Sequence, residues 1–353
     1  MNRKMLGLAI ALLVPLNALA ACGPTLAPTA APVVVTKEVP VVVTATPAPT
    51  KPAKVFKVAL ILPSTMDDLA WSQSMYEGVK KVKEEMGPAM EFTVSENLYK
   101  IVDAGAAIRD YAGKGYDLVI AHGSQYQTVI RDIAKEFPKT SFAYGTGFQT
   151  GPNIFAYDPQ AQQGGYMLGM LAAGMTKSGK VGIVGPVKGG DAIKYNEGFK
   201  QGVAAVNPKV IVLETYTGSF AEFVKAKEMA ATHMDAGADI LTGTAQQSVS
   251  ITKAAAERKG VYMLSSDMDQ SKLAPDTVLA SQVYQWDEVV RRMITLNKSG
   301  ILGGERLVLD FSGGKLQLVY NPKLEGNIPK DLKDKIEKTK QDIISGKLEI
   351  KLP

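Results

Sequence analysis

The sequence is poor in the residues that carry much enzyme chemistry: its 353 residues include one cysteine and two histidines. A single cysteine excludes an internal disulfide. Neither His122 nor His233 has further ligand residues nearby at the spacing of a metal site. The glycine-rich segment 180–192 lacks a phosphate-loop ending and a dinucleotide fingerprint, and the S-x-x-K pattern at 250–253 falls inside a helical run. These absences argue against an exported hydrolase and favour binding over catalysis.

An excess of charge of one sign is also lacking. The chain has 40 basic and 35 acidic residues, without any block of five or six basic ones. We therefore expect no nucleic-acid partner. A membrane span needs about 20 consecutive apolar residues, and the apolar run near the N-terminus is too short and too early for one.

Residues 1–21 have the pattern of a secretory signal peptide, with Arg3 and Lys4 before an apolar run and small residues. Segment 19–22, Leu-Ala-Ala-Cys, resembles the lipobox of bacterial lipoproteins. This resemblance implies cleavage before Cys22 and attachment of lipid to its sulfur. The alternative is an ordinary cleaved signal with an incidental cysteine. Without residues 1–21 the chain keeps 38 basic and 35 acidic residues, a net charge of +3.

Residues 22–54 are rich in proline, threonine, valine and alanine. Proline every few residues prevents a helix and disrupts a central strand. The composition predicts a semi-extended tether, which at about 3.1 Å per residue spans roughly 100 Å. In a competing interpretation the valine runs pair as a strand.

Short apolar runs alternate with helix-period segments from residue 55 onward. We expect strands at 55–62, 91–95, 116–122, 141–145, 180–185, 210–216, 238–243, 260–266 and 278–283. Continuous Val, Ile and Leu runs suit strands that are buried on both faces. The strand–helix–strand order predicts right-handed crossovers and parallel sheets. The fold class is therefore α/β.

A break at 153–160, with four strands before it, indicates two similar doubly wound lobes. Segment 306–320 is predicted to form a hairpin with Gly313 and Gly314 in its turn. A chain that crosses between lobes more than once makes a hinge, and the cleft between the lobes is a natural ligand site. The expected division is 55–157 plus about 280–305 for lobe 1, 158–279 plus about 306–325 for lobe 2, and 326–353 for a C-terminal helix and tail.

Five stretches in order resemble the basic membrane protein family, the purine-nucleoside receptors of ABC importers. They are DDLAWSQSMYEGVKK, YDPQAQQGGYMLGMLAAGMTKSGKVGIVG, YTGSFAEFVKAKEMA, SSDMDQ and the terminal DIISGKLEIKLP. The resemblance implies a type I periplasmic-binding-protein fold with ligand between the lobes. It also implies delivery of cargo to a membrane permease, with no catalysis and no cofactor. We expect a monomer.

The resemblance also assigns site residues. The family's first motif, an acid, an aromatic platform and often asparagine, corresponds to Asp68, Trp71 and Ser72. Its second aromatic, after Gly-Ser, corresponds to Phe220, and its ribose-contacting acid to Asp267.

Two positions depart from the nucleoside binders. Where they have a lysine, this chain has Tyr284, with Trp286 close by. Where they have an acid after the third strand, it has Tyr126 and Gln127. Two polar partners for a ribose are thus replaced, so the pattern favours a bare purine base, or a flat heterocycle such as a flavin. A ligand-sensing lipoprotein is a second class of function that the sequence leaves open.

These residues follow predicted strand ends, where open α/β lobes bind ligands, as does Gln246 after the strand at 238–243. Each also suits a purely structural role. Asp67 or Asp68 suits a helix cap, and Trp71 continues an apolar helix face with Met75 and Val79. Phe220 suits packing at a helix start, Asp267 a turn and Trp286 burial in a crossover helix, whereas Gln127 and Gln246 suit an ordinary surface.

Overall fold

The structure is a computed structural model that describes residues 54–353. The predicted signal peptide over 1–21, the lipidated Cys22 and all but the last residue of the predicted tether lie outside the described residues.

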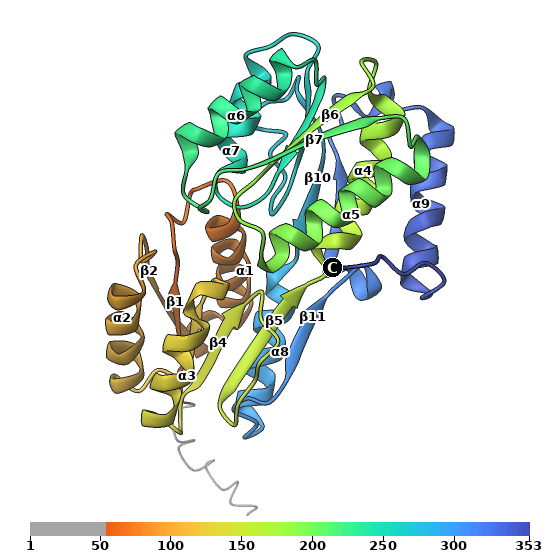
Figure 1. The fold of residues 1–353 in the computed structure, drawn as a ribbon. Helices are drawn as coiled ribbons and strands as arrows, with labels where there is room; N and C mark the ends of the chain where they lie inside the picture. Colours follow the sequence, from red (N-terminus) through yellow and green to blue (C-terminus); the bar gives the residue numbers. More distant parts are fainter. Residues whose placement is uncertain (1–53) are drawn as a thin grey trace, which may run out of the picture. The chain divides into compact units, whose positions relative to one another are not determined.

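Two six-stranded sheets form two lobes (Figure 1). The sheet of lobe 1 has the order β11-β5-β4-β3-β1-β2 and is parallel throughout. The sheet of lobe 2 has the order β12-β10-β9-β8-β6-β7, and only its edge strand β12 is antiparallel. Lobe 1 contains β1 (Phe56–Ile61), β2 (Met90–Ser95), β3 (Leu118–Ala121), β4 (Ser141–Gly145), β5 (Ile154–Pro159) and β11 (Arg306–Leu309). Lobe 2 contains β6 (Lys180–Gly185), β7 (Ile211–Tyr216), β8 (Ile240–Gly243), β9 (Tyr262–Ser265), β10 (Val278–Tyr284) and β12 (Leu316–Tyr320).

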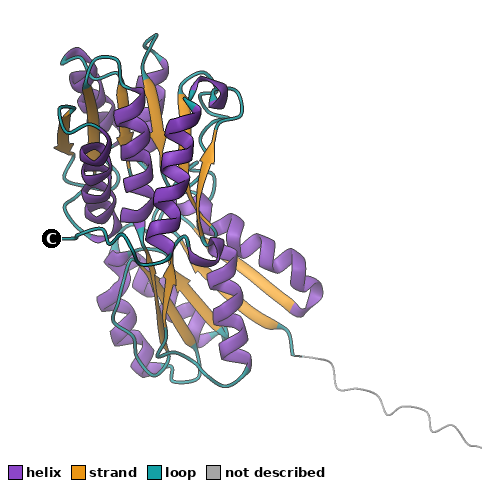
Figure 2. Ribbon diagram, turned by 90° about the vertical axis from the view of Figure 1, so that its right-hand side faces the viewer, coloured by secondary structure: helices purple, strands orange, loops and turns teal. Residues whose placement is uncertain are grey.

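Helices cover both faces of each sheet (Figure 2). In lobe 1, α1 (Trp71–Met86) packs with α8 (Trp286–Lys298) on one face, and α2 (Ile101–Gly113) with α3 (Gln127–Glu136) on the other. In lobe 2, α4 (Ala161–Met175) packs with α5 (Gly190–Val206) and α9 (Lys330–Ile344), and α6 (Phe223–Asp235) with α7 (Ser248–Ala256). Double coverage explains why the central strands are uninterrupted apolar runs.

The chain crosses between the sheets three times, after β5, after β10 and after β11. Two predictions fail here. The expected break at 153–160 contains β5, whose six residues are all buried. The expected hairpin at 306–320 does not form, because β11 pairs with β5 in lobe 1 (Figure 1). Strand β12 pairs instead with β10 in lobe 2. Residues 306–309 therefore belong to lobe 1, not to lobe 2 as predicted, and β10 lies wholly in the sheet of lobe 2.

Helices α4 and α5 approach closely through glycines on both sides. A Cβ atom on Gly198 would lie 2.1 Å from the backbone oxygen of Gln162, and one on Gly169 would lie 2.1 Å from that of Phe199. Backbone atoms cannot move aside as a flexible side chain can, so these glycines set the distance between the two helices.

Gly198→Ala is therefore expected to lower the free energy of unfolding by about 2 kcal/mol, the usual cost of overpacking. Urea denaturation measures it. Gly113→Ala in α2 is the matched control, because its Cβ would meet open space and alanine favours a helix. Equal stability of the two variants would show that α4 and α5 separate at little cost.

Candidate functional site

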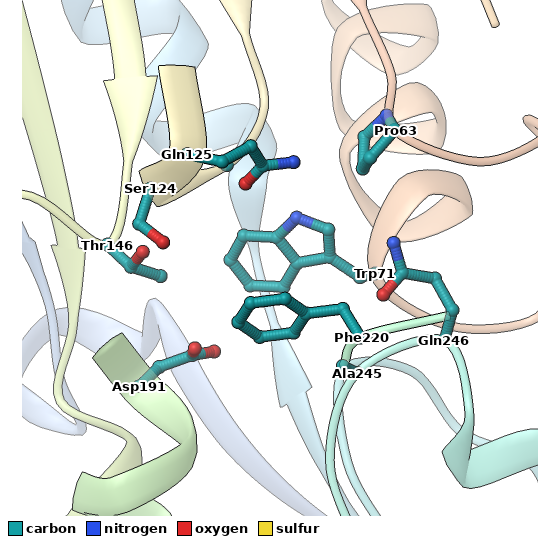
Figure 3. Close-up of a pocket in the computed structure, with 10 residues that line it drawn as sticks. Pro63, Trp71, Ser124, Gln125, Thr146, Asp191, Phe220, Ala245 and Gln246 are labelled. Carbon is teal, nitrogen blue, oxygen red and sulfur yellow. The ribbon is translucent and has the colours of Figure 1, made fainter. Parts of the chain in front are cut away.

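A cavity lies between the lobes at the carboxyl ends of strands from both sheets (Figure 3). Parallel strands leave backbone groups and loop side chains free at this edge, where open α/β sheets bind ligands. Lobe 1 contributes Pro63, Trp71, Gly123, Ser124, Gln125 and Thr146, and lobe 2 contributes Asp191, Phe220, Ala245 and Gln246.

The cavity has a volume of about 20 Å³. That is room for about one water molecule, since a cavity needs roughly 10–15 Å³ of such free volume to hold one. A bicyclic ring is several times larger. Entry of such a ligand therefore requires the walls from the two lobes to move apart, and the three crossings provide the hinge for that motion.

Trp71 is the first residue of α1 and is only 6% exposed. One face of its indole stacks on the His122 ring, with the centroids 4.1 Å apart and the planes at 11°. Tyr284 and Trp286 meet the indole edge-on at 6.1 and 5.4 Å. Trp71 is thus part of the core of lobe 1, as its apolar helix face indicated, and at the same time a wall of the cavity.

Phe220 reaches the cavity from lobe 2, in the loop that follows β7. Figure 3 shows its ring and the indole of Trp71 projecting into the same part of the cavity. Two aromatic walls from different lobes suit a flat ligand, because stacking needs a π face on the ligand and no particular hydrogen-bond pattern.

Two polar side chains of lobe 2 also line the cavity. Gln246 is 4% exposed, and its Oε1 has no hydrogen-bond partner in residues 54–353. A buried acceptor without a partner is costly and commonly marks a place for a ligand donor. The second residue, Asp191, lies in the first turn of α5. Sequence reasoning missed it, although it directly follows the glycines after β6.

Burial raises the pKa of Asp191 to about 6, with Lys194 opposing the shift. The folded protein therefore binds this proton more tightly than the unfolded chain, so the free energy of unfolding falls as pH rises from about 4 to about 6. Asp191→Asn is expected to remove this decrease and to raise stability at pH 7 by up to about 3 kcal/mol. Urea denaturation at pH 4.5 and 7 tests it, with the exposed Asp132→Asn as control. Identical pH profiles for wild type and Asp191→Asn would contradict it.

A second cavity, of about 440 Å³, lies on the hinge side between α1, the loop after β9 and the β10–α8 crossing. Asp267, Tyr284 and Trp286 line it. The carboxylate of Asp267 is 1% exposed and its Oδ2 has no partner among the described residues. Burial and the neighbouring carboxylates of Asp191 and Asp68 raise its pKa well above the usual range.

Backbone strain concentrates around these two cavities. Five non-glycine residues of the described chain have positive φ, and four of them line one cavity or the other. These four are Leu69, Thr146, Ala245 and Asp267. Each such conformation costs about 1–3 kcal/mol and persists where the surroundings enforce it, typically at ligand sites.

Seven predicted contact residues do not line the cavity between the lobes: Asp267, Tyr284 and Trp286 line only the second cavity, and the other four line neither. Asp68 accepts hydrogen bonds from the backbone N–H groups of Ala70, Ser72 and Gln73, which is a capping role at the start of α1. Ser72 is fully buried and its hydroxyl oxygen accepts from the Ser64 N–H.

The remaining two lie elsewhere in lobe 1. The Tyr126 hydroxyl donates to the Leu98 oxygen within lobe 1, and the Gln127 amide donates to Gln149 at its surface. Tyr284 and Trp286 are buried, and their polar atoms pair with Gln282 and Ser74.

Comparison with known families decides the class of protein. The sequence profile of the family described as "ABC transporter substrate-binding protein PnrA-like" matches residues 55–352. The chain belongs to this PnrA-like family. The predicted resemblance is thus confirmed, and so is the prediction that the protein is not an enzyme. PnrA-like proteins act outside the cytoplasm, where they bind a small ligand and work with a permease.

Relatives of this PnrA-like chain cover most of its length. A purine-binding protein of Brucella abortus is 29% identical over 292 residues, which are 83% of this chain and 82% of the relative. Basic membrane protein A1 of Borrelia garinii is 26% identical over 307 residues, 83% and 87% of the two chains. A solved solute-binding protein of an ABC transporter system from Aeropyrum pernix matches with a TM-score of 0.74 at 20% identity, covering 84% and 94% of the chains. This structure confirms the predicted two-lobed fold.

Residues 54–353 contain neither a transmembrane helix nor a metal-binding cluster. No helix there combines the length and hydropathy of a transmembrane span. No cluster of three histidine, cysteine or acidic side chains in the same range is placed to hold a metal ion.

Proposed function

We propose that this PnrA-like protein is the receptor of an ABC importer for purine nucleobases, anchored to the outer face of the cytoplasmic membrane by lipid on Cys22. The observation that carries the proposal is the pair of aromatic walls, Trp71 from lobe 1 and Phe220 from lobe 2. The purine-binding relative supports the same class of cargo.

Simple energetics assign roles to the polar residues. Stacking on aromatic rings contributes about 1–3 kcal/mol per base, whereas micromolar affinity needs about 8 kcal/mol. Hydrogen bonds must supply much of the remainder. Gln246 has a buried, unpartnered acceptor that suits a ring N–H or an exocyclic amino group, and Asp191 lies across the cavity from it (Figure 3).

A base is favoured over a nucleoside because of what surrounds Trp71. The resemblance places a ribose partner of the nucleoside binders at the position of Tyr284. That tyrosine is 4% exposed and packs with Trp286 against the indole edge. Its hydroxyl oxygen already accepts from the Gln282 amide, so a neutral, largely enclosed aromatic side chain stands where the resemblance places a charged ribose partner.

Closure of the lobes follows from the same geometry. Because Trp71 and Phe220 lie on different lobes, a ligand contacts both only when the lobes are together. Such a ligand binds the closed form more tightly and shifts the population toward it. The permease then has a surface that differs between the loaded and the empty receptor.

Calorimetry tests the cargo. Residues 52–353, the compact unit, are refolded to remove ligand carried through purification. The protein is then titrated with adenine, hypoxanthine, guanine, their nucleosides and riboflavin. Binding of bases but not nucleosides supports the proposal. Tighter binding of nucleosides would mean that different groups hold the ribose, and no binding across the panel would overturn the purine assignment.

Lipid anchoring has its own test in cells that express the full chain. Cys22→Ser is expected to move the protein from the membrane fraction to the soluble extracytoplasmic fraction, because each buried lipid CH₂ contributes about 0.8 kcal/mol to membrane binding. Thr25→Ser is the control for a change near the cleavage site. A Cys22→Ser protein that stays with the membrane would contradict the anchor.

A further inference from the structure

His122 is a buried histidine that the proposed function does not use. It directly follows β3, is 0% exposed, and does not line the cavity between the lobes. Burial lowers its pKa to about 3, so the ring is neutral at ordinary pH. A neutral imidazole with no route to solvent acts through its shape and its two nitrogens.

Both ring nitrogens of His122 are occupied. Nε2 lies 3.0 Å from the backbone oxygen of Trp71, and Nδ1 lies 2.8 Å from the hydroxyl of Tyr157. A carbonyl oxygen only accepts, so Nε2 must carry the proton. Nδ1 is then the acceptor, and the Tyr157 hydroxyl donates to it. The Trp71 carbonyl thus fixes the tautomer, and Tyr157, on β5, supports it by donating to Nδ1.

The contact between His122 and Trp71 is reciprocal. The indole Nε1–H of Trp71 donates to the backbone oxygen of His122 at 3.1 Å, while the imidazole donates to the backbone oxygen of Trp71. The two rings also stack at 4.1 Å, and Tyr157 continues the stack behind His122 at 5.8 Å and 19°. Both the backbone and the indole of Trp71 are therefore held by one residue.

We propose that His122 is a positioning residue, which holds the indole of Trp71 as a fixed stacking wall for the ligand without contacting the ligand itself. The proposal rests on the proposed function, because it assigns Trp71 to ligand binding. Its physical basis is preorganisation: a ring already held in its bound orientation loses less freedom when the ligand arrives.

His122→Phe tests the proposal, because phenylalanine keeps a ring in the stack and loses both side-chain hydrogen bonds. Affinity for the base that binds tightest in the calorimetric panel is expected to fall roughly tenfold, the equivalent of one buried hydrogen bond. His233→Phe is the matched control, since His233 is also buried but lies in α6, away from Trp71. It is expected to leave the affinity unchanged.

A spectroscopic arm separates positioning from a general loss of structure. In a Trp286→Phe background Trp71 is the only tryptophan, so its near-ultraviolet circular dichroism and emission report the indole environment. His122→Phe is expected to weaken its dichroism and shift its emission without ligand, whereas His233→Phe leaves both unchanged. If no purine binds wild type, the proposed function fails, and this arm alone decides whether His122 fixes the indole.

Tyr157→Phe decides the case if His122→Phe does not fold. It removes one hydroxyl and leaves Nδ1 of His122 without its donor, so we expect smaller changes in the same direction in affinity and in the Trp71 spectrum. The proposal would be overturned if whichever of these two variants folds keeps the wild-type affinity and Trp71 spectrum. It would also be overturned if the loss of affinity in His122→Phe merely matches the fraction of that variant that is unfolded.

Discussion

Replacing Trp71 by leucine is expected to weaken purine binding by about 2 kcal/mol, roughly thirtyfold in Kd, because the ligand loses the stacking wall of lobe 1. Leucine is preferable to alanine here. Trp71 is 6% exposed and belongs to the core of lobe 1, so alanine would leave a cavity as well as remove the ring. Calorimetry with the base that binds tightest to wild type measures the change.

Phe92→Leu is the matched control for this prediction. Phe92 is a partly buried aromatic residue of lobe 1 that packs against Tyr76 and does not line either of the two cavities described above. It is expected to lower stability slightly and to leave affinity unchanged. Wild-type affinity in Trp71→Leu would mean that the ring only packs the core of lobe 1, the role that its apolar helix face also suits.

Asp158→Asn is expected to lower the free energy of unfolding by about 3 kcal/mol, the order of cost when one partner of a buried ion pair is removed. The Asp158 carboxylate is 5% exposed and accepts from Lys194 Nζ at 2.5 Å and from the Arg306 guanidinium. Lys194 lies on α5 of lobe 2, whereas Asp158 and Arg306 lie on neighbouring strands of lobe 1. The carboxylate therefore joins the two lobes beside a hinge crossing.

Urea denaturation of Asp158→Asn measures this cost. Asp110→Asn is the control, because Asp110 pairs with Lys114 at 2.6 Å on an exposed surface, where such pairs contribute at most about 1 kcal/mol. A loss in Asp158→Asn no larger than in the control would show that water screens the hinge pair as it screens a surface pair. Lobe 1 and lobe 2 would then be joined mainly by their shared apolar core.

The pair also explains a failed prediction. The predicted break at 153–160 contains Asp158 and Pro159, and a charged residue and a proline both weaken a central strand. Lys194 lies 36 positions after Asp158 in the sequence, and Arg306 lies 148 positions after it. No local sequence pattern therefore reveals that these two residues neutralise the charge of Asp158. Strand β5 forms because tertiary contacts compensate what its own sequence disfavours. The hairpin prediction at 306–320 failed for a related reason: the partner of each strand lies far away in sequence.

The candidate site was also predicted only in part. Trp71, Phe220 and Gln246 were predicted and line the cavity, because the end of a parallel strand fixes where the next loop begins. Asp68, Ser72, Tyr126 and Gln127 follow strand ends equally well but face a helix terminus, the interior of lobe 1 or its surface. Position after a strand does not determine which way a side chain points within its loop.

The sequence by itself determined most of the strands and the fold class. Apolar runs and helix periods are local, so they specify buried strands, covering helices, parallel sheets and the edge at which ligands bind. Only the tertiary structure decided which strand joins which sheet, that Asp191 faces the cavity, and that His122 and Tyr157 stand behind Trp71. These outcomes depend on contacts between residues far apart in the chain, whose energies appear only when the two lobes are packed.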